Sequence, residues 1–332
     1  MNRLNAWLVA LTLCFPPLIA VADGPLPDGP LRVRNVSPVV QLYGMPRMVG
    51  AKLADHRLEF SFNLEAANNF QSDLVDETWV FFDGESYVLS PRLRGRLGRN
   101  YDWSVEVPWV AHTPGTFDGV VDEFHETFGL PDGERFMAPR HRLDYHVRSE
   151  GVVYADFQDS QREMGDVRLT LGRAVFDDPG RGTLTVRAQL KLPTGDVDTL
   201  SGSGGLDSSV WGEYAYGLPL NGRMLRLSVA GGISYLGEGE LIPERQESWM
   251  HFGHVGIQYN ARHWLQLHAQ ADAHSQVLET GNPLIADGGL LGTIGSRFAV
   301  SPNTWLDLAI VEDLLNESAS DVVFQVMLAT RF

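Results

Sequence analysis

The C-terminal end of the chain is the feature that most limits its fold. Phe324, Val326 and Leu328 occupy alternate positions before the terminal Phe332, and polar or small residues lie between them. A period of two is typical of a β-strand. A terminal strand that ends on an aromatic carboxylate is the assembly signal of many outer-membrane β-barrels, although Thr330 stands where a tyrosine or an apolar residue is commoner. The alternative is the last strand of a soluble sheet.

The first 22 residues have the organisation of a secretory signal peptide. Arg3 precedes an apolar run over residues 6–20, and Ala20-Val21-Ala22 forms a small-x-small cleavage site. The run is short for a membrane-spanning helix and contains two prolines, which disfavours the alternative of a retained anchor. Cys14 is the only cysteine, so cleavage would leave a chain without a disulfide or a thiolate metal site. We therefore expect export to the cell outer membrane.

Composition narrows the possible partners. The chain carries 26 Lys and Arg against 42 Asp and Glu, a net charge of −16, which argues against nucleic acid as a partner. Its mean hydropathy is −0.12, a value that resembles a soluble protein. A β-barrel gives the same average, because lipid-facing and lumen-facing residues alternate and cancel in any hydropathy window.

The alternation recurs along the whole mature chain and predicts an all-β, transmembrane antiparallel β-barrel of about twelve strands, within a range of ten to fourteen. The segments with this pattern are 58–64, 87–97, 103–109, 167–171, 184–192, 210–216, 225–234, 255–259, 265–272, 289–299, 306–310 and 321–332. An even number of strands places both ends in the periplasm. A soluble sandwich or propeller is the competing fold, but long apolar faces with aromatic residues near their ends favour contact with lipid.

The connections between these segments alternate between short and long, as in barrels with periplasmic turns and external loops. The short ones are 98–100, 177–182, 220–222, 260–262 and 301–303, and the long ones are 67–76, 112–163, 193–207, 237–248, 275–287 and 314–320. The pattern divides the chain into a signal peptide (1–22), a periplasmic or lumen-inserted segment (23–55) and a barrel (56–332) with a long external loop over 112–163.

Charged residues on the polar parity of the strands are the candidate functional residues. Arg92, Arg94 and Arg96 share one face of a strand and are spaced by about 7 Å. The other lumen candidates are Glu59, Glu65, Asp102, Glu106, Arg187, His268 and Asp272. Salt bridges that fill a wide lumen are one interpretation, and a charged constriction that selects solutes by sign is the other.

Two further groups of residues have types that could carry out chemistry. His268, Asp272 and His274 lie on one parity beside Ser275, as a lipid hydrolase would need, but the lipase nucleophile motif is missing, so we predict no catalytic residue. Asp118, Asp122 and Glu126 repeat every four residues on an expected short helix, which is more typical of a solvated face than of a Ca²⁺ site. We therefore expect no metal and no cofactor.

One loop resembles a known family. Its residues are Phe124, His125, Phe128, Gly129 and Pro131, within the run 124–133. Together with the runs 29–35, 83–85, 191–196 and 311–313, this loop is similar to an uncharacterised outer-membrane family, domain of unknown function 3187. The resemblance implies an outer-membrane barrel and implies no activity.

The sequence thus predicts a monomeric barrel in contact with outer-membrane lipid and with the barrel-assembly machinery. A passive channel or a binding barrel for a small solute is the leading hypothesis for its function. A structural or envelope-assembly barrel and an outer-membrane lipid hydrolase are the alternatives.

Overall fold

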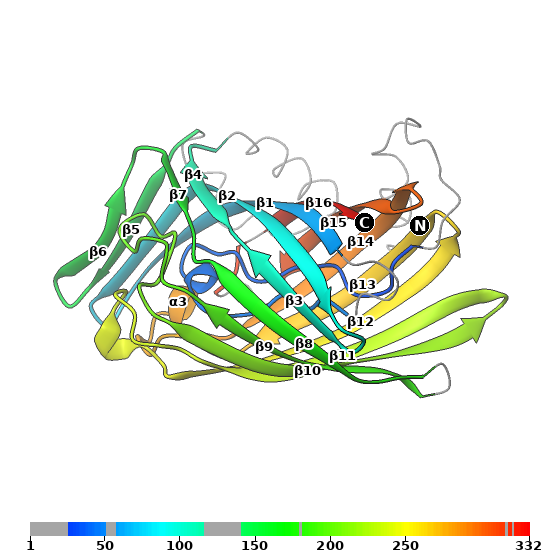
Figure 1. Cartoon of the computed structure of the whole chain (residues 1–332). Helices are drawn as coiled ribbons and strands as arrows, with labels where there is room; N and C mark the ends of the chain where they lie inside the picture. The colour runs from blue at the N-terminus through cyan, green and yellow to red at the C-terminus, as the bar shows by residue number, and fades with distance from the viewer. Residues whose placement is uncertain (1–25, 51–57, 116–140, 179–180, 316–317, 321) are drawn as a thin grey trace.

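A closed antiparallel barrel of twelve strands dominates the computed structural model, which describes residues 26–50, 58–115, 141–178, 181–315, 318–320 and 322–332 (Figure 1). Each barrel strand pairs with its neighbours around the ring. The barrel strands are β1 (Leu58–Val75), β2 (Thr78–Leu97), β3 (Tyr101–Glu106), β8 (Arg168–Asp178), β9 (Gly182–Lys191), β10 (Asp207–Leu220), β11 (Arg223–Tyr235), β12 (Trp249–Arg262), β13 (Leu265–His274), β14 (Gly289–Ser301), β15 (Thr304–Asp313) and β16 (Val322–Arg331). The twelve expected segments are therefore confirmed.

The first and last strands close the ring. β1 pairs with β16 from Glu59 opposite Arg331 to Asn68 opposite Val322. The amide of Phe332 donates to the carbonyl of Leu58 at 2.9 Å, which extends this ladder to the end of the chain. Closure leaves no unpaired strand edge in the ring, as a barrel in lipid requires.

Residues on the two parities of each strand face different surroundings. Phe62 and Val255 are 45% and 56% exposed on the outer surface, whereas the inward-facing Ser61 and Asn63 are almost fully buried. The outer surface is therefore apolar and the inner surface polar, as the period of two predicts. Among the described residues, no helix is long and apolar enough to cross a membrane.

The connection between β1 and β2 differs from the expected long loop over 67–76. β1 continues to Val75, and β2 begins at Thr78, so only a tight turn remains. Asp76 and Glu77 have φ values of 47° and 65°, the conformation of a two-residue hairpin turn. The expectation was wrong because polar residues such as Asn69 face a buried interior: its amide donates to Ser86 Oγ at 2.9 Å.

The segment between β3 and β8 adds further strands beyond the ring. They are β4 (Trp109–Thr113), β5 (Asp144–Ser149), β6 (Val152–Phe157) and β7 (Gln161–Met164). β4 and β5 pair with successive parts of β2, while β7 pairs with β4 and β6 pairs with β5. The signal peptide 1–22, the expected helix over 118–129 and the family-like loop 124–133 lie outside the described residues.

Residues 26–50 run through the interior of the barrel (Figure 1). The 3₁₀ helix η1 (Val40–Leu42) is the only regular element in this segment. The described part of the chain has two other short helices, η3 (Pro243–Arg245) in the β11–β12 connection and α3 (Pro283–Ala286) in the β13–β14 connection. We call residues 26–50 the inner segment. The short-turn end of the barrel carries the turns 98–100, 221–222, 263–264 and 302–303. The long-loop end carries the connections 192–206, 236–248 and 275–288.

Candidate functional site

Most sequence-predicted lumen residues are buried inside the barrel, where they meet the inner segment or one another. Their side chains come from five strands of the ring, so the inner surface is charged on several sides. The residues that are at most 7% exposed are Glu59, Glu65, Arg92, Arg94, Asp102, Glu106, Arg187, His268 and Asp272. Arg96 lies nearer the short-turn end, where it is half-buried and donates to the carbonyl of Gly98 at 3.3 Å.

The three arginines of β2 have different partners. Arg92 donates to Ser104 Oγ at 3.0 Å, and Arg94 forms an ion pair with Asp102 at 2.7 Å. Asp102 also accepts from Arg187 on β9 at 2.7 Å. This part of the lumen is therefore a network of charges across three strands of the wall, and the arginines do not act as one uniform row.

The first limb of the inner segment, residues 26–35, is held by polar side chains of the wall. Arg297 donates to the carbonyls of Pro27, Gly29 and Pro30 at 2.8, 3.3 and 3.3 Å. Gln270 holds both backbone groups of Leu31, accepting from its amide at 3.0 Å and donating to its carbonyl at 3.2 Å. The wall thus supplies the hydrogen bonds that this limb would make in a sheet.

Ion pairs join the inner segment to the acids of the wall. Arg47 pairs with Glu65 and, at 2.6 Å, with Glu106, which also lies 3.4 Å from Arg32. Burial alone would lower the pKa of the Arg47 guanidinium, but the two carboxylates raise the pKa above its usual value. The inner segment therefore neutralises Glu65 of β1 and Glu106 of β3, two of the acids predicted to face the lumen.

The second limb, residues 44–50, returns toward the short-turn end. The carbonyl of Gly44 accepts from Gln189 at 3.2 Å and from Ser209 at 2.9 Å. Gly50 donates to Glu213 and accepts from Arg187 at 2.9 Å. A Cβ on Gly50, whose φ is +77°, would lie 2.7 Å from the Cα of Gly29, so the two limbs touch where glycine is needed.

The tip of the inner segment, residues 39–43, packs into an apolar cluster at the long-loop end. Val39, Val40, Leu42 and Tyr43 are each 1% exposed. Their neighbours in this tip cluster include Phe82, Tyr145, Leu200, Trp211, Leu236, Leu241, Met250, Phe252, Val277, Leu278 and Ile285. Burial, with the charge of Asp207 in addition, raises the pKa of the Tyr43 hydroxyl, which therefore stays neutral. The hydrophobic effect holds the tip, and polar contacts hold the limbs.

Three buried guanidinium groups have no carboxylate within 4.0 Å among the described residues. Arg34 and Arg168 both donate to the carbonyl of Gln41, at 3.4 and 3.3 Å, and Arg92 is the third. Burial, followed by the charges of Arg168 and Arg47, lowers the pKa of Arg34. The interior thus contains positive charges that form no direct ion pair with a described carboxylate, despite the net charge of −16 for the whole chain.

The pair suggested for a lipid hydrolase is not assembled. His274 Nδ1 lies 2.9 Å from the carbonyl oxygen of Ser275, and its Nε2 lies 3.0 Å from the amide of Asn35. Ser275 Oγ donates to the carbonyl of Gln276 at 3.4 Å. His274 and Ser275 do not pair, because adjacent residues of a strand end point in different directions. No group of three or more potential metal ligands occurs among the described residues.

Sequence reasoning missed the inner segment as the partner of the lumen charges. Arg32, Arg34 and Arg47 are the signal that could have found it, because they concentrate positive charge in a stretch without strand periodicity. Apolar residues at 39–43 were a second signal, since they match no strand face.

The comparisons with known proteins agree with this architecture. Residues 7–332 match the family described as "Protein of unknown function (DUF3187)". No curated protein sequence matches the chain. Among solved structures, the COG4313 outer membrane channel from Pseudomonas putida F1 is similar over 85% of this chain and 100% of its own, with a TM-score of 0.54 and 10% identity. At that identity, the likeness shows a shared fold.

Two other solved structures are less similar. A structure of the NanC porin covers 83% of this chain and 100% of its own, with a TM-score of 0.46 and 7% identity. The toluene transporter TodX from P. putida covers 84% of this chain and 91% of its own, with a TM-score of 0.39 and 11% identity. The fold assignment depends on neither of them.

Proposed function

We propose for this chain, which belongs to the DUF3187 family of proteins of unknown function, the role of an outer-membrane channel or binding barrel for a small solute. In this proposal the lumen is closed by the inner segment, and the long loops face outward from the cell. The apolar outer surface, the polar interior and the fold shared with an outer-membrane channel support it.

The observation that carries the proposal is how the inner segment is held. It contributes no strand to the ring, and its contacts are side-chain hydrogen bonds, ion pairs and apolar packing. The segment can therefore move without breaking any of the strand pairings that close the wall.

The charge of the interior favours an anionic or polar solute. Arg34, Arg92 and Arg168 have no carboxylate within 4.0 Å among the described residues, and a guanidinium keeps its proton at working pH. When the inner segment moves, Arg34 leaves with it, whereas Arg92 and Arg168 stay on the wall. Selectivity then depends on these fixed charges more than on the net charge of the molecule.

Conductance in planar bilayers tests the proposal. We expect rare openings for the native chain and more frequent openings for Arg47→Gln, because this change removes the ion pairs to Glu65 and Glu106. Arg262→Gln is the matched control, since Arg262 is exposed at the end of β12 and its one hydrogen bond among the described residues goes to the adjacent carbonyl of Ala261. Absence of openings in all three folded proteins would favour a structural barrel without transport.

A salt gradient tests the preference for anions. The reversal potential of the open Arg47→Gln channel should indicate anion preference, and adding Arg92→Gln should shift it toward cations. An unchanged reversal potential would assign Arg92 a purely structural role. A monomer in contact with lipid and with the barrel-assembly machinery is part of the same proposal, and size-exclusion chromatography in detergent tests the oligomeric state.

A further inference from the structure

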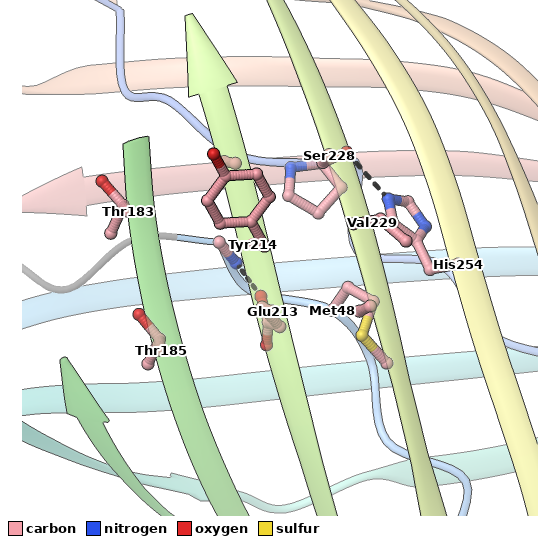
Figure 2. A pocket seen from close by; sticks show the side chains of 12 residues that line it. Met48, Thr183, Thr185, Glu213, Tyr214, Ser228, Val229 and His254 are labelled. Atoms are coloured by element: carbon pink, nitrogen blue, oxygen red, sulfur yellow. Dashed lines mark hydrogen bonds between the residues drawn. The ribbon is translucent and has the colours of Figure 1, made fainter. Parts of the chain in front are cut away.

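A small cavity lies between the inner segment and the wall (Figure 2). Its volume is about 20 Å³, enough for one water molecule. Ala215 on β10 and Ala230 on the neighbouring β11 line it, so the wall is hollowed there by small residues. Pro30 and Gly50 of the inner segment close the cavity from the other side.

Three side chains beside this cavity form a continuous hydrogen-bonded relay. Ser228 Oγ on β11 lies 3.0 Å from His254 Nε2 on β12 (Figure 2). His254 Nδ1 lies 2.8 Å from Asp272 Oδ1 on β13. The other oxygen of Asp272 accepts from Gln270 at 2.9 Å. With both oxygens occupied, the Asp272 carboxylate orients the ring so that Nδ1 carries the proton and Nε2 accepts from the Ser228 hydroxyl.

The strand register explains how distant residues of the sequence reach this arrangement. His254 lies directly opposite Asp272. Ser228 lies directly opposite Gly256, which is two residues from His254 along β12. A Cβ on Gly256 would lie 2.7 Å from Ser228 Oγ and 2.9 Å from His254 Nε2. Glycine at this position therefore permits the close approach of the serine and the histidine.

We propose that Ser228, His254 and Asp272 form a nucleophilic triad that hydrolyses small carboxylic esters inside the lumen. A serine hydroxyl next to a histidine that is oriented by a carboxylate is the arrangement that activates serine in unrelated hydrolase folds. His254 and Asp272 are each 3% exposed, so the relay is shielded from competing water, while Ser228 faces the cavity.

The reaction that this geometry supports is balanced in two steps. Ser228 Oγ attacks the acyl carbonyl as its proton passes to His254 Nε2, and the proton then goes to the departing alcohol as the ester C–O bond breaks. Water attacks the acyl-serine, gives a proton to His254 Nε2 and releases the carboxylic acid, after which the proton returns to Ser228 Oγ. Asp272 holds the imidazolium through both steps.

The far wall of the cavity holds a buried hydroxyl of its own. Thr185 on β9 is 1% exposed, and its hydroxyl has no hydrogen-bond partner among the described residues. Figure 2 places Thr185 and Ser228 on opposite sides of the cavity. A buried hydroxyl without a hydrogen-bond partner destabilises the folded protein unless a ligand or a water molecule forms a hydrogen bond with it.

The size of the cavity requires a local movement before an ester can enter. Asp28 fixes this part of the first limb, because it lies 2.5 Å from Arg226 Nε and accepts from Gln258 at 3.5 Å. The change Asp28→Ala should loosen the limb over Ser228 without touching the triad. The proposed reaction does not require solute passage, so conductance and ester hydrolysis are separate readouts.

The test uses the full chain, folded in detergent, with the small probe diisopropyl fluorophosphate. Attack by Ser228 breaks the P–F bond, releases fluoride and leaves a phosphoryl adduct that mass spectrometry locates. We expect the adduct on Ser228 in the native chain and faster labelling in Asp28→Ala. Hydrolysis of p-nitrophenyl acetate by Asp28→Ala should fall about 10²–10⁴-fold when His254→Gln is added. Ser228→Ala should remove the labelling.

Heat-modifiable migration on gels keeps the result interpretable, because it reports folding of each variant independently. Ser90 on β2 is the internal control, since it is buried and its hydroxyl lacks a partner among the described residues, yet no histidine activates it. Absence of a Ser228 adduct in both the native chain and Asp28→Ala would overturn the proposal. So would equal labelling of Ser228 and Ser90, or labelling that His254→Gln leaves unchanged.

Discussion

The wall of the barrel and its inner segment are stabilised in different ways. Every strand of the wall pairs with two neighbours, and its outer side chains are apolar. The inner segment has no strand pairing and depends on ion pairs along its limbs and on packing at its tip. One part is held by a continuous backbone ladder, and the other is held by individual side chains, which single substitutions can remove.

This difference predicts which substitutions affect access to the lumen and which affect folding of the wall. A closed wall cannot lose a few hydrogen bonds without exposing backbone groups to lipid. The inner segment can leave its contacts because water can hydrate the freed groups in the lumen. A change in the segment should therefore alter access to the lumen, whereas a change in the wall should alter folding.

The largest expected effect concerns assembly of the wall. The Phe332 side chain is 68% exposed, yet its backbone closes the ring with Leu58. If the terminal strand is recognised during assembly, as we propose, Phe332→Ala should lower the yield of heat-modifiable protein strongly in cells. Leu315→Ala, at another exposed apolar residue, is the control. Equal yields from the two variants would remove Phe332 from the assembly signal.

The next effect concerns the tip of the inner segment. Leu42 is 1% exposed in the tip cluster, so Leu42→Ala should destabilise the seated segment by about 2–5 kcal/mol. Trypsin should then cleave faster after Arg34 and Arg47, while the barrel keeps its heat-modifiable migration. Leu74→Ala, at a residue 67% exposed at the end of β1, should leave cleavage unchanged. Unfolding of the wall in Leu42→Ala would contradict the separation of the two parts.

A substitution on the lipid-facing side should destabilise the wall and leave the contacts of the inner segment unchanged. Ile294 is 44% exposed near the middle of β14, and Ile294→Arg should destabilise the barrel by roughly 2–4 kcal/mol at the bilayer midplane. Ile294→Phe keeps the surface apolar and should cost much less. Urea unfolding in lipid vesicles measures both changes. Equal midpoints would place Ile294 outside the membrane.

The sequence predicted the wall well because each strand carries its own signal. A lipid-facing residue at every second position marks a strand without reference to its partners, and all twelve strands were found in this way. The β1–β2 hairpin was missed because Asn69 and its neighbours are polar and also buried, so polarity there suggested a loop.

The interior was less predictable because its contacts join distant parts of the chain. Arg47 meets Glu106, and Ser228 meets His254, only after the register of the strands and the path of the inner segment are known. Sequence parity placed Asp272 and Arg187 inside the barrel, but it could not give their partners. Parity gives the face of a residue, whereas partners depend on three-dimensional packing.

The smallest expected effect is a gain in the stability of the seated inner segment. Tyr43 is 1% exposed in the tip cluster, and its hydroxyl has no hydrogen-bond partner among the described residues. Tyr43→Phe removes a buried unsatisfied group and should stabilise the seated segment by about 1 kcal/mol, seen as slower trypsin cleavage after Arg47. Tyr145→Phe is the matched control, because the Tyr145 hydroxyl accepts from Asn69 at 2.8 Å and its loss should destabilise the same cluster.

The pH dependence of Tyr43 separates the cost of its hydroxyl from simple differences in packing. Burial raises the folded-state pKa of Tyr43 above the unfolded value of about 10. The folded state then holds the proton more tightly, so the contribution of Tyr43 is fully present below about pH 10 and declines as the pH rises further. Native protein should lose stability above that pH, and Tyr43→Phe should lose less. Because ionisation of the other tyrosines affects both proteins equally, a constant difference between the two across this range would show that the Tyr43 hydroxyl reaches water when the segment is seated.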